Sequence, residues 1–368
     1  MATAMMAETL PVVAKVRSAK HIPALDGLRG VAILAVFFYH YGAGGILRAS
    51  AAIRVLGTFC GFGWSGVDLF FVLSGFLITG ILFDTQHDPS YYRKFYARRT
   101  LRIFPIYYLF AAIVVLIIPF KAWHVGDLFF LFYLGYPAAI IWPALVDVPV
   151  QITHLWSLSV EEQFYMLWPW LIRKLRSPRN ILTFCAVVGV ASLAFRVTFP
   201  KWAYGSLPAR MDDLAAGAAL AILVRGDLRN RCEKMALPLF IASAAVVILI
   251  CAVRHTTERS DRLICTAGFS MIALAYGSLL LLSLGPLAGF FSLPALRIFG
   301  KYSYGMYLYH LPLAAVSEHA KPFFARLPLG AFLYVAVCLT ANLVIAALSF
   351  HLIEQPILNL KKRFEYGG

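Results

Sequence analysis

Long apolar runs separated by short polar stretches make up most of the chain. Most of the runs are roughly 18 residues or longer, which is enough for a helix to cross a ~30 Å hydrocarbon core. The pattern therefore predicts an all-α fold, a polytopic integral membrane helix bundle. The runs fall near residues 25–45, 63–83, 101–119, 125–145, 158–172, 181–199, 208–224, 235–253, 263–284, 303–318 and 329–353.

The run near 125–145 differs from the others because Gly135, Pro137 and Pro143 interrupt it. Basic residues indicate whether it crosses, since Lys and Arg concentrate on the cytoplasmic side of a membrane. If it does not cross, the remaining ten runs place 22 basic residues inside and 10 outside; if it does, the division is 16 and 16. We therefore expect about ten transmembrane helices, both termini in the cytoplasm, and a re-entrant or interfacial segment near 125–145.

Composition leads to the same conclusion. Hydrophobic residues are 61% of the 368 positions and charged residues 14%, whereas soluble proteins average about 25% charged. The net charge of +15 is accounted for by cytoplasmic loops, so we expect no nucleic-acid partner. The six cysteines lie in apolar runs without CxxC spacing, which predicts buried thiols rather than a disulfide framework or a metal site.

The chain divides into three parts. Residues 1–20 lack the continuous apolar core and the cleavage site of a signal peptide, so we expect a cytoplasmic N-terminal tail. Residues 21–360 carry all the apolar runs and should form one transmembrane domain, and residues 361–368 a cytoplasmic C-terminal tail. No internal repeat, low-complexity linker or appended soluble domain is apparent.

Polar residues within the apolar runs are candidates for function, because each costs several kcal/mol in hydrocarbon. Arg29 and His40 lie eleven residues apart in the first run, which is about three helical turns and ~16 Å along the axis. They should share one inward-facing stripe. Taken singly, Arg29 could be a snorkelling residue and His40 a histidine bonded to a neighbouring helix; their common face favours function.

Six blocks of sequence resemble the acyltransferase-3 family of membrane acyltransferases, in the family's order. The resemblance extends over about residues 21–360. No single block is specific to the family, but six blocks in the family's order are. The blocks are LDGLRG at 25–30 running on to His40, GWSGVDLFFVLSGF at 63–76, FYARRTLRIFP at 95–105, HLWSLSVEEQFY at 154–165, GKYSY at 300–304 and IEQP at 353–356.

The resemblance implies a ten-helix membrane domain that acylates hydroxyls of sugars or small molecules, usually from acetyl-CoA. Some members carry a further extracytoplasmic hydrolase-like domain; this chain ends soon after Glu354, so we expect a single-domain enzyme. We predict transfer of an acetyl or other short acyl group from acetyl-CoA to a hydroxyl of a cell-surface glycan or lipid-linked sugar, in the inner (plasma) membrane. Acetyl-CoA is then a substrate, and no permanently bound cofactor or metal is expected.

Two other functions remain open from the residues. The same machinery could acylate a small secondary metabolite such as a macrolide. A chain of this kind could instead transport a polar lipid or sugar, but paired broken helices in related halves, which many transporters show, are not apparent. The acceptor, the acyl chain length and the oligomeric state are not determined by the sequence.

Arginines at the start of the third run are candidates for binding the donor. Arg99 and Arg102 are neighbours on one helix face, and guanidinium forks suit the phosphates of CoA. The alternative is that they anchor the helix at the cytoplasmic side; the family's Arg-x-x-Arg pattern favours donor binding. Glu354, at the cytoplasmic end of the last run, should complete the donor site or bind an arginine.

The resemblance also points to Glu161 as a catalytic residue beside Arg29 and His40. Its neighbour Glu162 has capping-box spacing from Ser159, so a structural role explains that carboxylate.

Other polar residues should contact the acceptor or support the site. Asp68 could orient His40 or bind hydroxyls, or simply favour a helix start. His154 and Trp156 should lie at the outer interface, and Arg210 could pair with an aspartate or bind sugar. In the tenth run His310 is a rival catalytic base. The full supporting set is Asp68, His154, Trp156, Arg210, Asp212, Ser303, Tyr307 and His310.

We expect acetyl-CoA to enter from the cytoplasm with its phosphates on Arg99 and Arg102. His40 would then act as general base on the acceptor hydroxyl or carry the acetyl group as an acyl-imidazole. The sequence does not choose between these two routes.

Overall fold

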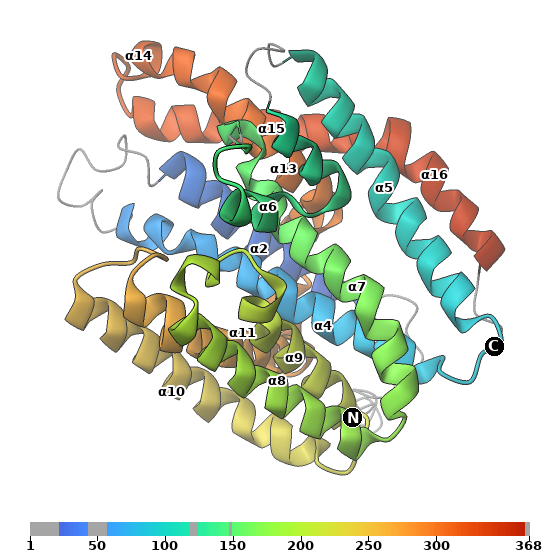
Figure 1. The fold of residues 1–368 in the computed structure, drawn as a ribbon. Helices are drawn as coiled ribbons and strands as arrows, with labels where there is room; N and C mark the ends of the chain where they lie inside the picture. Colours follow the sequence, from blue (N-terminus) through green and yellow to red (C-terminus); the bar gives the residue numbers. More distant parts are fainter. Residues whose placement is uncertain (1–21, 43–56, 118–123, 147–148, 365–368) are drawn as a thin grey trace, which may run out of the picture.

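A computed structural model describes residues 22–42, 57–117, 124–146 and 149–364 of the chain. Within these ranges it is built from helices and contains no β-strand. In Figure 1, α4 runs through the middle of the bundle, while α8 and α10 form one outer edge and α5 and α16 the opposite one. The all-α prediction is confirmed.

In the described part of the chain ten long helices form the bundle, and each lies on one of the apolar runs other than 125–145. Each is 16–27 residues long. They are α2 (Pro23–Gly42), α4 (Gly66–Asp84), α5 (Tyr91–Ile117), α7 (Trp156–Leu175), α8 (Pro178–Thr198), α9 (Leu207–Leu223), α10 (Arg229–Arg254), α11 (Phe269–Leu284), α13 (Pro294–Ser317) and α15 (Gly330–Ser349).

Shorter elements connect or extend the long helices. They are η3 (Gly63–Ser65), η5 (Val125–Phe132), α6 (Gly135–Ile141), η6 (Val150–Leu155), η7 (Pro200–Trp202), η8 (Ile264–Gly268), α12 (Ala288–Phe291), η9 (Glu318–Ala320), α14 (Lys321–Phe324), η10 (Phe350–Glu354), α16 (Gln355–Asn359) and η11 (Leu360–Phe364). Two of them, η8 and η10, are π-helical turns continuous with α11 and α15, and such turns occur often at functional sites.

Six helices in the described part of the chain are long and apolar enough to cross a membrane, which makes this a multi-pass membrane protein. They contain α4, α5, α8, α10, α11 and α15. The other four long helices, α2, α7, α9 and α13, carry most of the candidate polar residues, and α9 has only 17 residues. Ten crossings and the orientation of the termini therefore stay predictions.

The segment near 125–145 does not form one long helix. It splits into η5 and α6, which have eight and seven residues, at Tyr133, whose φ of 58° places it in the left-handed region. The Gly126 amide donates to the Leu145 carbonyl at 3.0 Å, so the two ends of the segment lie side by side. The segment therefore turns back on itself, and its re-entrant or interfacial placement in the membrane stays a prediction.

Close helix crossings hold the centre together. A Cβ on Gly75 of α4 would collide with the Leu214 carbonyl of α9, and one on Gly217 of α9 with the Val72 carbonyl of α4. The α2–α13 crossing uses Gly30 and Gly300 in the same reciprocal way. Glycines let backbones approach closely where lipid supplies no hydrophobic drive between helices.

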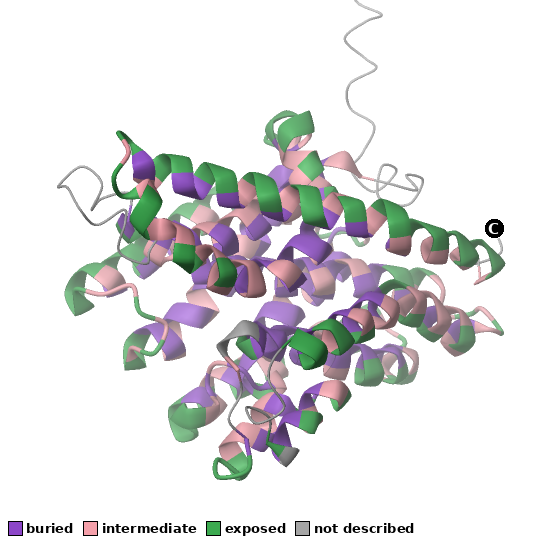
Figure 2. Cartoon of the chain, turned by 90° about the horizontal axis from the view of Figure 1, so that it is seen from above, coloured by how far each residue is buried: buried purple, intermediate pink, exposed green. Residues whose placement is uncertain are grey.

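Burial separates inner from outer helices. The apolar stretch of α4 is 72% buried, whereas those of α8 and α10 are 22% buried. Figure 2 shows the outer helices exposed along their outward faces and buried toward the centre. Side chains such as Val190 and Ile248 are thus positioned to contact lipid.

Candidate functional site

Three adjoining cavities extend through the bundle between α2, α4, α5, α7 and α13. We call them the mouth cavity, about 570 Å³, the arginine cavity, about 100 Å³, and the histidine cavity, about 240 Å³. Arg29 and Arg102 line both the mouth and the arginine cavities. Tyr307 and Val67 line both the arginine and the histidine cavities. The three cavities are therefore consecutive.

The mouth cavity is rich in positive charge. Four basic residues line it, against the two carboxylates of Asp26 and Glu354, and Arg29 donates to Asp26 at 3.1 Å. Glu354 lies in the π-turn η10 and is 8% exposed, and its Oε1 has no hydrogen-bond partner among the described residues. The basic residues are Arg29, Arg102, Arg297 and Lys301.

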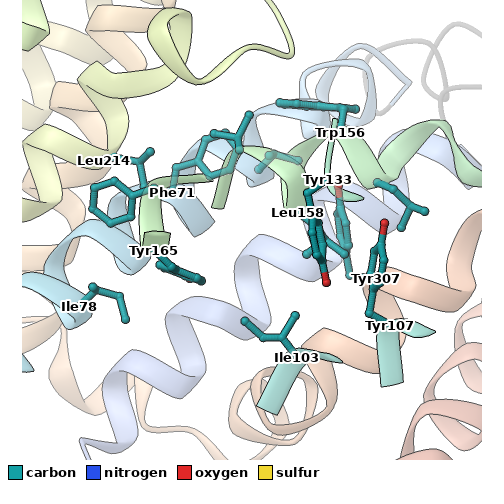
Figure 3. Packing of buried hydrophobic residues seen from close by; sticks show 14 of the residues in the cluster. Phe71, Ile78, Ile103, Tyr107, Tyr133, Trp156, Leu158, Tyr165, Leu214 and Tyr307 are labelled. Carbon is teal, nitrogen blue, oxygen red and sulfur yellow. The ribbon is translucent and has the colours of Figure 1, made fainter. Parts of the chain in front are cut away.

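The arginine cavity gathers three guanidinium groups around one carboxylate, within the described part of the chain. Arg99 lies over the Tyr165 ring at 4.9 Å, and Glu161 accepts a hydrogen bond from the Ser74 hydroxyl at 2.5 Å. The rest of the wall is largely apolar; Figure 3 shows Phe71 and Ile103, which line this cavity, in the surrounding core. The cavity is a narrow passage with charged groups at one side.

In the histidine cavity, the His40 ring has a defined tautomer. His40 Nδ1 lies 2.9 Å from the Val36 carbonyl. A carbonyl oxygen only accepts, so the Nδ1 atom carries a proton, and in the neutral imidazole Nε2 then holds the lone pair. His40 Nε2 has no partner among the described residues, and the ring lines the cavity. The lone pair is therefore available to a ligand.

Two further histidines lie behind His40. The ring of His310 lies 4.8 Å from that of His40 and 4.9 Å from that of His154. His310 Nδ1 is 2.6 Å from the Tyr307 carbonyl, and the side chain is fully buried. It lines none of the three cavities.

Tyr307 stands at the junction between the arginine and histidine cavities. Its hydroxyl lies 2.5 Å from the Ser157 hydroxyl and 2.9 Å from the His154 carbonyl. Two hydroxyl groups thus meet at the point where the two cavities adjoin.

The sequence model of the acyltransferase-3 family, described as an acyltransferase domain, matches residues 22–350 of the chain. The chain belongs to the acyltransferase-3 family. It is 28% identical over 377 residues to the peptidoglycan O-acetyltransferase OatA of Listeria monocytogenes, covering 92% of this chain and 56% of that protein. It is 27% identical over 376 residues to the O-acetyltransferase OatA of Staphylococcus aureus strain NCTC 8325, covering 93% and 58%.

This acyltransferase-3 chain thus spans a little over half the length of the curated relatives that it matches. No solved structure matches it significantly. The predicted resemblance is confirmed.

The structure brings most of the predicted site residues of this acyltransferase-3 domain together. They line one or more of the three consecutive cavities. They are Arg29, His40, Arg99, Arg102, His154, Trp156, Glu161, Ser303, Tyr307 and Glu354.

The aspartate pairing expected for Arg210 is confirmed, whereas Asp68 and Asp212, expected on the acceptor side, do not line the cavities. Asp68 does not orient His40; it pairs with Arg210, which also pairs with Asp213 at 2.9 Å. Asp212 binds Arg196 through both carboxylate oxygens, at 2.9 and 2.7 Å. Buried charges need such partners, and the pairs lie between α4, α8 and α9 and line none of the three cavities.

The structure places three further candidates close to the cavities. His154 and Trp156 are 4% and 7% exposed and line the histidine cavity; their depth in the membrane stays a prediction. His310 lies against His40 in one cluster, and which of the two is the base also stays a prediction. His154 and His310 come from segments far apart in the chain, and contacts between distant segments leave no trace in local periodicity.

The capping role expected for Glu162 is wrong as well. Helix α7 begins at Trp156, so Ser159 is already inside it and its hydroxyl donates to the Leu155 carbonyl at 3.2 Å. Glu162 is 7% exposed and its Oε1 has no partner among the described residues.

Sequence reasoning missed residues that the cavities expose. Arg297 and Lys301 line the mouth cavity, and Arg259 lines the histidine cavity. The sequence feature that could have identified them is the one that identified Arg99, namely a cation at the edge of an apolar run. Arg196 is not among the predicted site residues, although it lies within an apolar run, where a charged residue indicates function or a charged partner. Across the described ranges, no group of three or more His, Cys, Asp or Glu side chains is placed to hold a metal ion.

Proposed function

We propose that this chain is a membrane O-acyltransferase that moves an acetyl or other short acyl group from acyl-CoA to a hydroxyl of a cell-surface glycan. The observation that carries the proposal is the succession of cavities, from a cationic mouth to the free Nε2 lone pair of His40. Membership of the acyltransferase-3 family supports group transfer. The relatives named as peptidoglycan O-acetyltransferases support a glycan of the cell envelope as acceptor.

The donor binds at the mouth cavity in this proposal. CoA carries several phosphate charges, and Arg29, Arg102, Arg297 and Lys301 supply cations around a space of about 570 Å³. Arginine forks bind phosphate through paired hydrogen bonds. The carboxylate of Glu354 is then free to accept a hydrogen bond from the adenine or ribose part of the donor.

The pantetheine arm extends through the arginine cavity. That cavity is narrow and largely apolar, which suits an unbranched chain better than a sugar. The thioester carbonyl then reaches Ser157 and Tyr307 at the junction with the histidine cavity. Both hydroxyls are engaged at the His154 carbonyl, so one of them must rotate toward the thioester before it can donate to the oxyanion that forms when the carbonyl is attacked.

His40 activates the attack. Its Nδ1–H is held by the Val36 carbonyl, so Nε2 accepts the proton of the acceptor hydroxyl while the oxygen bonds to the thioester carbon. CoA then leaves as the thiol with that proton. Alternatively Nε2 attacks first, an acyl-imidazole forms as CoA departs, and the acceptor hydroxyl displaces the imidazole. Both routes use the same atom.

Purified full-length protein in proteoliposomes tests the proposal. With radiolabelled acetyl-CoA and soluble peptidoglycan fragments, label should pass to the fragments as an alkali-labile ester. Free CoA should appear in proportion. No acceptor-dependent release of CoA, and no ester on any surface glycan of cells that produce the protein, would overturn the proposed function.

A further inference from the structure

Residues 255–262, between α10 and η8, form a short loop that reaches the histidine cavity. The Trp64 indole donates to the Thr257 carbonyl at 2.9 Å. Asp261 closes the loop by accepting from the Arg254 side chain and the Leu263 amide, each at 2.9 Å. Burial acts to raise the pKa of Asp261, but these hydrogen bonds and the charge of Arg254 lower it overall. The Asp261 carboxylate that closes the loop therefore stays charged.

This loop places Arg259 in the cavity wall. Its guanidinium lies 4.3 Å from the Tyr204 ring and 5.8 Å from the Tyr39 ring, and Nη1 donates to the Tyr204 hydroxyl at 3.1 Å. Tyr39 in turn contacts the His40 ring, with 4.8 Å between centroids. The Tyr39 ring therefore contacts both Arg259 and His40, the proposed base.

Arg259 is the only permanently charged residue among the described residues that line the histidine cavity. Among the described residues it forms no ion pair with a carboxylate, and the one hydrogen bond of its side chain uses Nη1. Arg196 and Arg210, which are fully buried, differ because each is neutralised by an aspartate. A partly buried guanidinium with free N–H groups is suited to a ligand that brings its own negative charge.

The rest of the wall is aromatic. Seven Phe, Tyr and Trp side chains surround the space. Such rings bury the apolar faces of a ligand, while the polar edges of Tyr and Trp form hydrogen bonds. Sugar rings present such faces. The seven are Tyr39, Trp64, Phe130, Tyr136, Trp156, Tyr204 and Tyr307.

We propose that the acceptor is an anionic saccharide, and that Arg259 binds a carboxylate or phosphate on it close to the hydroxyl that His40 activates. This inference rests on the proposed function, since it assigns the acceptor to the histidine cavity. Arg259 acts in acceptor binding and specificity, and it takes no part in proton transfer.

A matched set of acceptors tests the proposal in proteoliposomes. N-acetylmuramic acid differs from N-acetylglucosamine by a lactyl carboxylate, and its methyl ester keeps the shape without the charge. N-acetylglucosamine 1-phosphate carries the anion at the position where a lipid carrier would be attached. Binding is read from quenching of tryptophan fluorescence, because Trp64 and Trp156 line the cavity. Transfer is read as kcat and KM with acetyl-CoA.

The wild-type protein should bind one of the two anionic probes roughly ten- to a hundredfold more tightly than its neutral counterpart. Preference for the carboxylate identifies a charge on the sugar itself, and preference for the sugar phosphate identifies a carrier phosphate. Arg259→Gln should remove the preference by raising KM for the anionic probe. Its effect on KM for the neutral sugar should be much smaller, because that sugar brings no negative charge for Arg259 to bind.

Arg262→Gln is the matched control, because Arg262 is exposed on the same loop and lines none of the cavities. It should keep the preference. Equal binding of charged and neutral probes by the wild type would overturn the proposal, as would a preference that survives in Arg259→Gln. A fall in kcat that is equal for all acceptors would mean that Arg259 stabilises the transition state instead. Hydrolysis of acetyl-CoA without acceptor reports separately on the proposed function.

Discussion

At the scale of single residues, the tautomer of His40 decides what the site can do. Its Nδ1 proton is engaged by Val36, one turn earlier in the same helix. The helix that places the ring in the cavity therefore also leaves the reactive nitrogen unprotonated. A second histidine, His310, lies against the first and lines none of the three cavities described above, so we expect it to support the position of His40 rather than to contact a ligand.

We expect His40→Asn to lower turnover by roughly 10²–10⁴-fold, the usual worth of general base catalysis. Asparagine keeps approximate size and hydrogen bonding but has no basic nitrogen. The protein should still insert and bind acetyl-CoA. The measurement is kcat in proteoliposomes, with donor binding by equilibrium dialysis.

His310→Asn is the control, and it should cost clearly less. A normal rate for His40→Asn together with an inactive His310→Asn would move catalysis to α13. Label retained on His40 after incubation with acetyl-CoA alone would establish the acyl-imidazole route.

The arginines allow a second test at this scale. Arg99→Lys keeps the charge but loses the planar group that stacks on Tyr165 at 4.9 Å, and Arg102→Lys loses the fork at the mouth. Each should weaken acetyl-CoA binding while kcat at saturation changes little. Arg93→Lys, exposed in the first turn of α5, should bind the donor normally. Wild-type affinity in both test variants would return Arg99 and Arg102 to a role in anchoring the helix.

How far the site could be predicted depends on the kind of evidence each residue needs. Spacing along one helix placed Arg29 and His40 on a common face, and the family blocks pointed to Glu161 and Arg102. All four line the consecutive cavities. The partners of Asp68 could not be predicted, because they depend on how α9 is rotated toward α4. The helical period shows which face of its own helix a residue occupies, but it does not show which other helix packs against that face.

At the scale of helices, buried ion pairs that line none of the three cavities connect the helices around them. Arg196 of α8 binds Asp212 of α9 and the Ser270 hydroxyl of α11, at 2.7 Å in each case for Nη2. Arg210 of α9 pairs with Asp68 of α4 and lies 4.2 Å from the Phe269 ring. These contacts join four helices at one place.

We therefore expect Asp212→Asn to act on stability rather than on acceptor recognition. Removing one partner of a buried pair costs about 3–5 kcal/mol, because the other charge stays buried without compensation. The free energy of unfolding in mixed micelles should fall, with KM for the acceptor unchanged in the folded fraction. The double variant Arg196→Met/Asp212→Leu should recover much of the stability. A raised KM without a stability change would restore Asp212 to the acceptor site.

The interrupted segment near 125–145 shows what periodicity can and cannot give for an element. Gly135, Pro137 and Pro143 correctly marked it as different from the long helices. The break itself falls at Tyr133, a residue with no such signal, which adopts a positive φ. The Gly126–Leu145 hydrogen bond that closes the segment is a contact between its two ends, and neither residue type predicts it.

At the scale of the whole molecule, the cavities give the bundle two chemically different ends. The mouth cavity gathers Arg102, Arg297 and Lys301, whereas the histidine cavity is aromatic and has one cation, Arg259. Acyl-CoA is a cytoplasmic metabolite, and an envelope glycan lies outside. A passage between two different ends suits an enzyme that takes its donor from one side of the membrane and its acceptor from the other.

This arrangement requires a particular topology, which cysteine accessibility can test. The turn between α7 and α8 should be cytoplasmic, because that orientation places 22 basic residues inside and 10 outside. In spheroplasts carrying a variant without the native cysteines, Ser177→Cys should react with an impermeant maleimide only after permeabilisation. Ser177 caps α8 through the Asn180 amide at 3.2 Å, so the substitution costs about 1 kcal/mol and leaves the fold intact.

Ser260→Cys provides the opposite position. Ser260 is exposed beside Arg259 in the loop 255–262, which the same topology places outside, so it should react in intact spheroplasts. Joint labelling of the two positions from one side would contradict the odd number of crossings between them. Reversed labelling would put the aromatic cavity on the cytoplasmic side, where a cytoplasmic glycoside would be the accessible acceptor and an envelope glycan would not. The pair of cysteines therefore tests the direction of transfer as well as the fold.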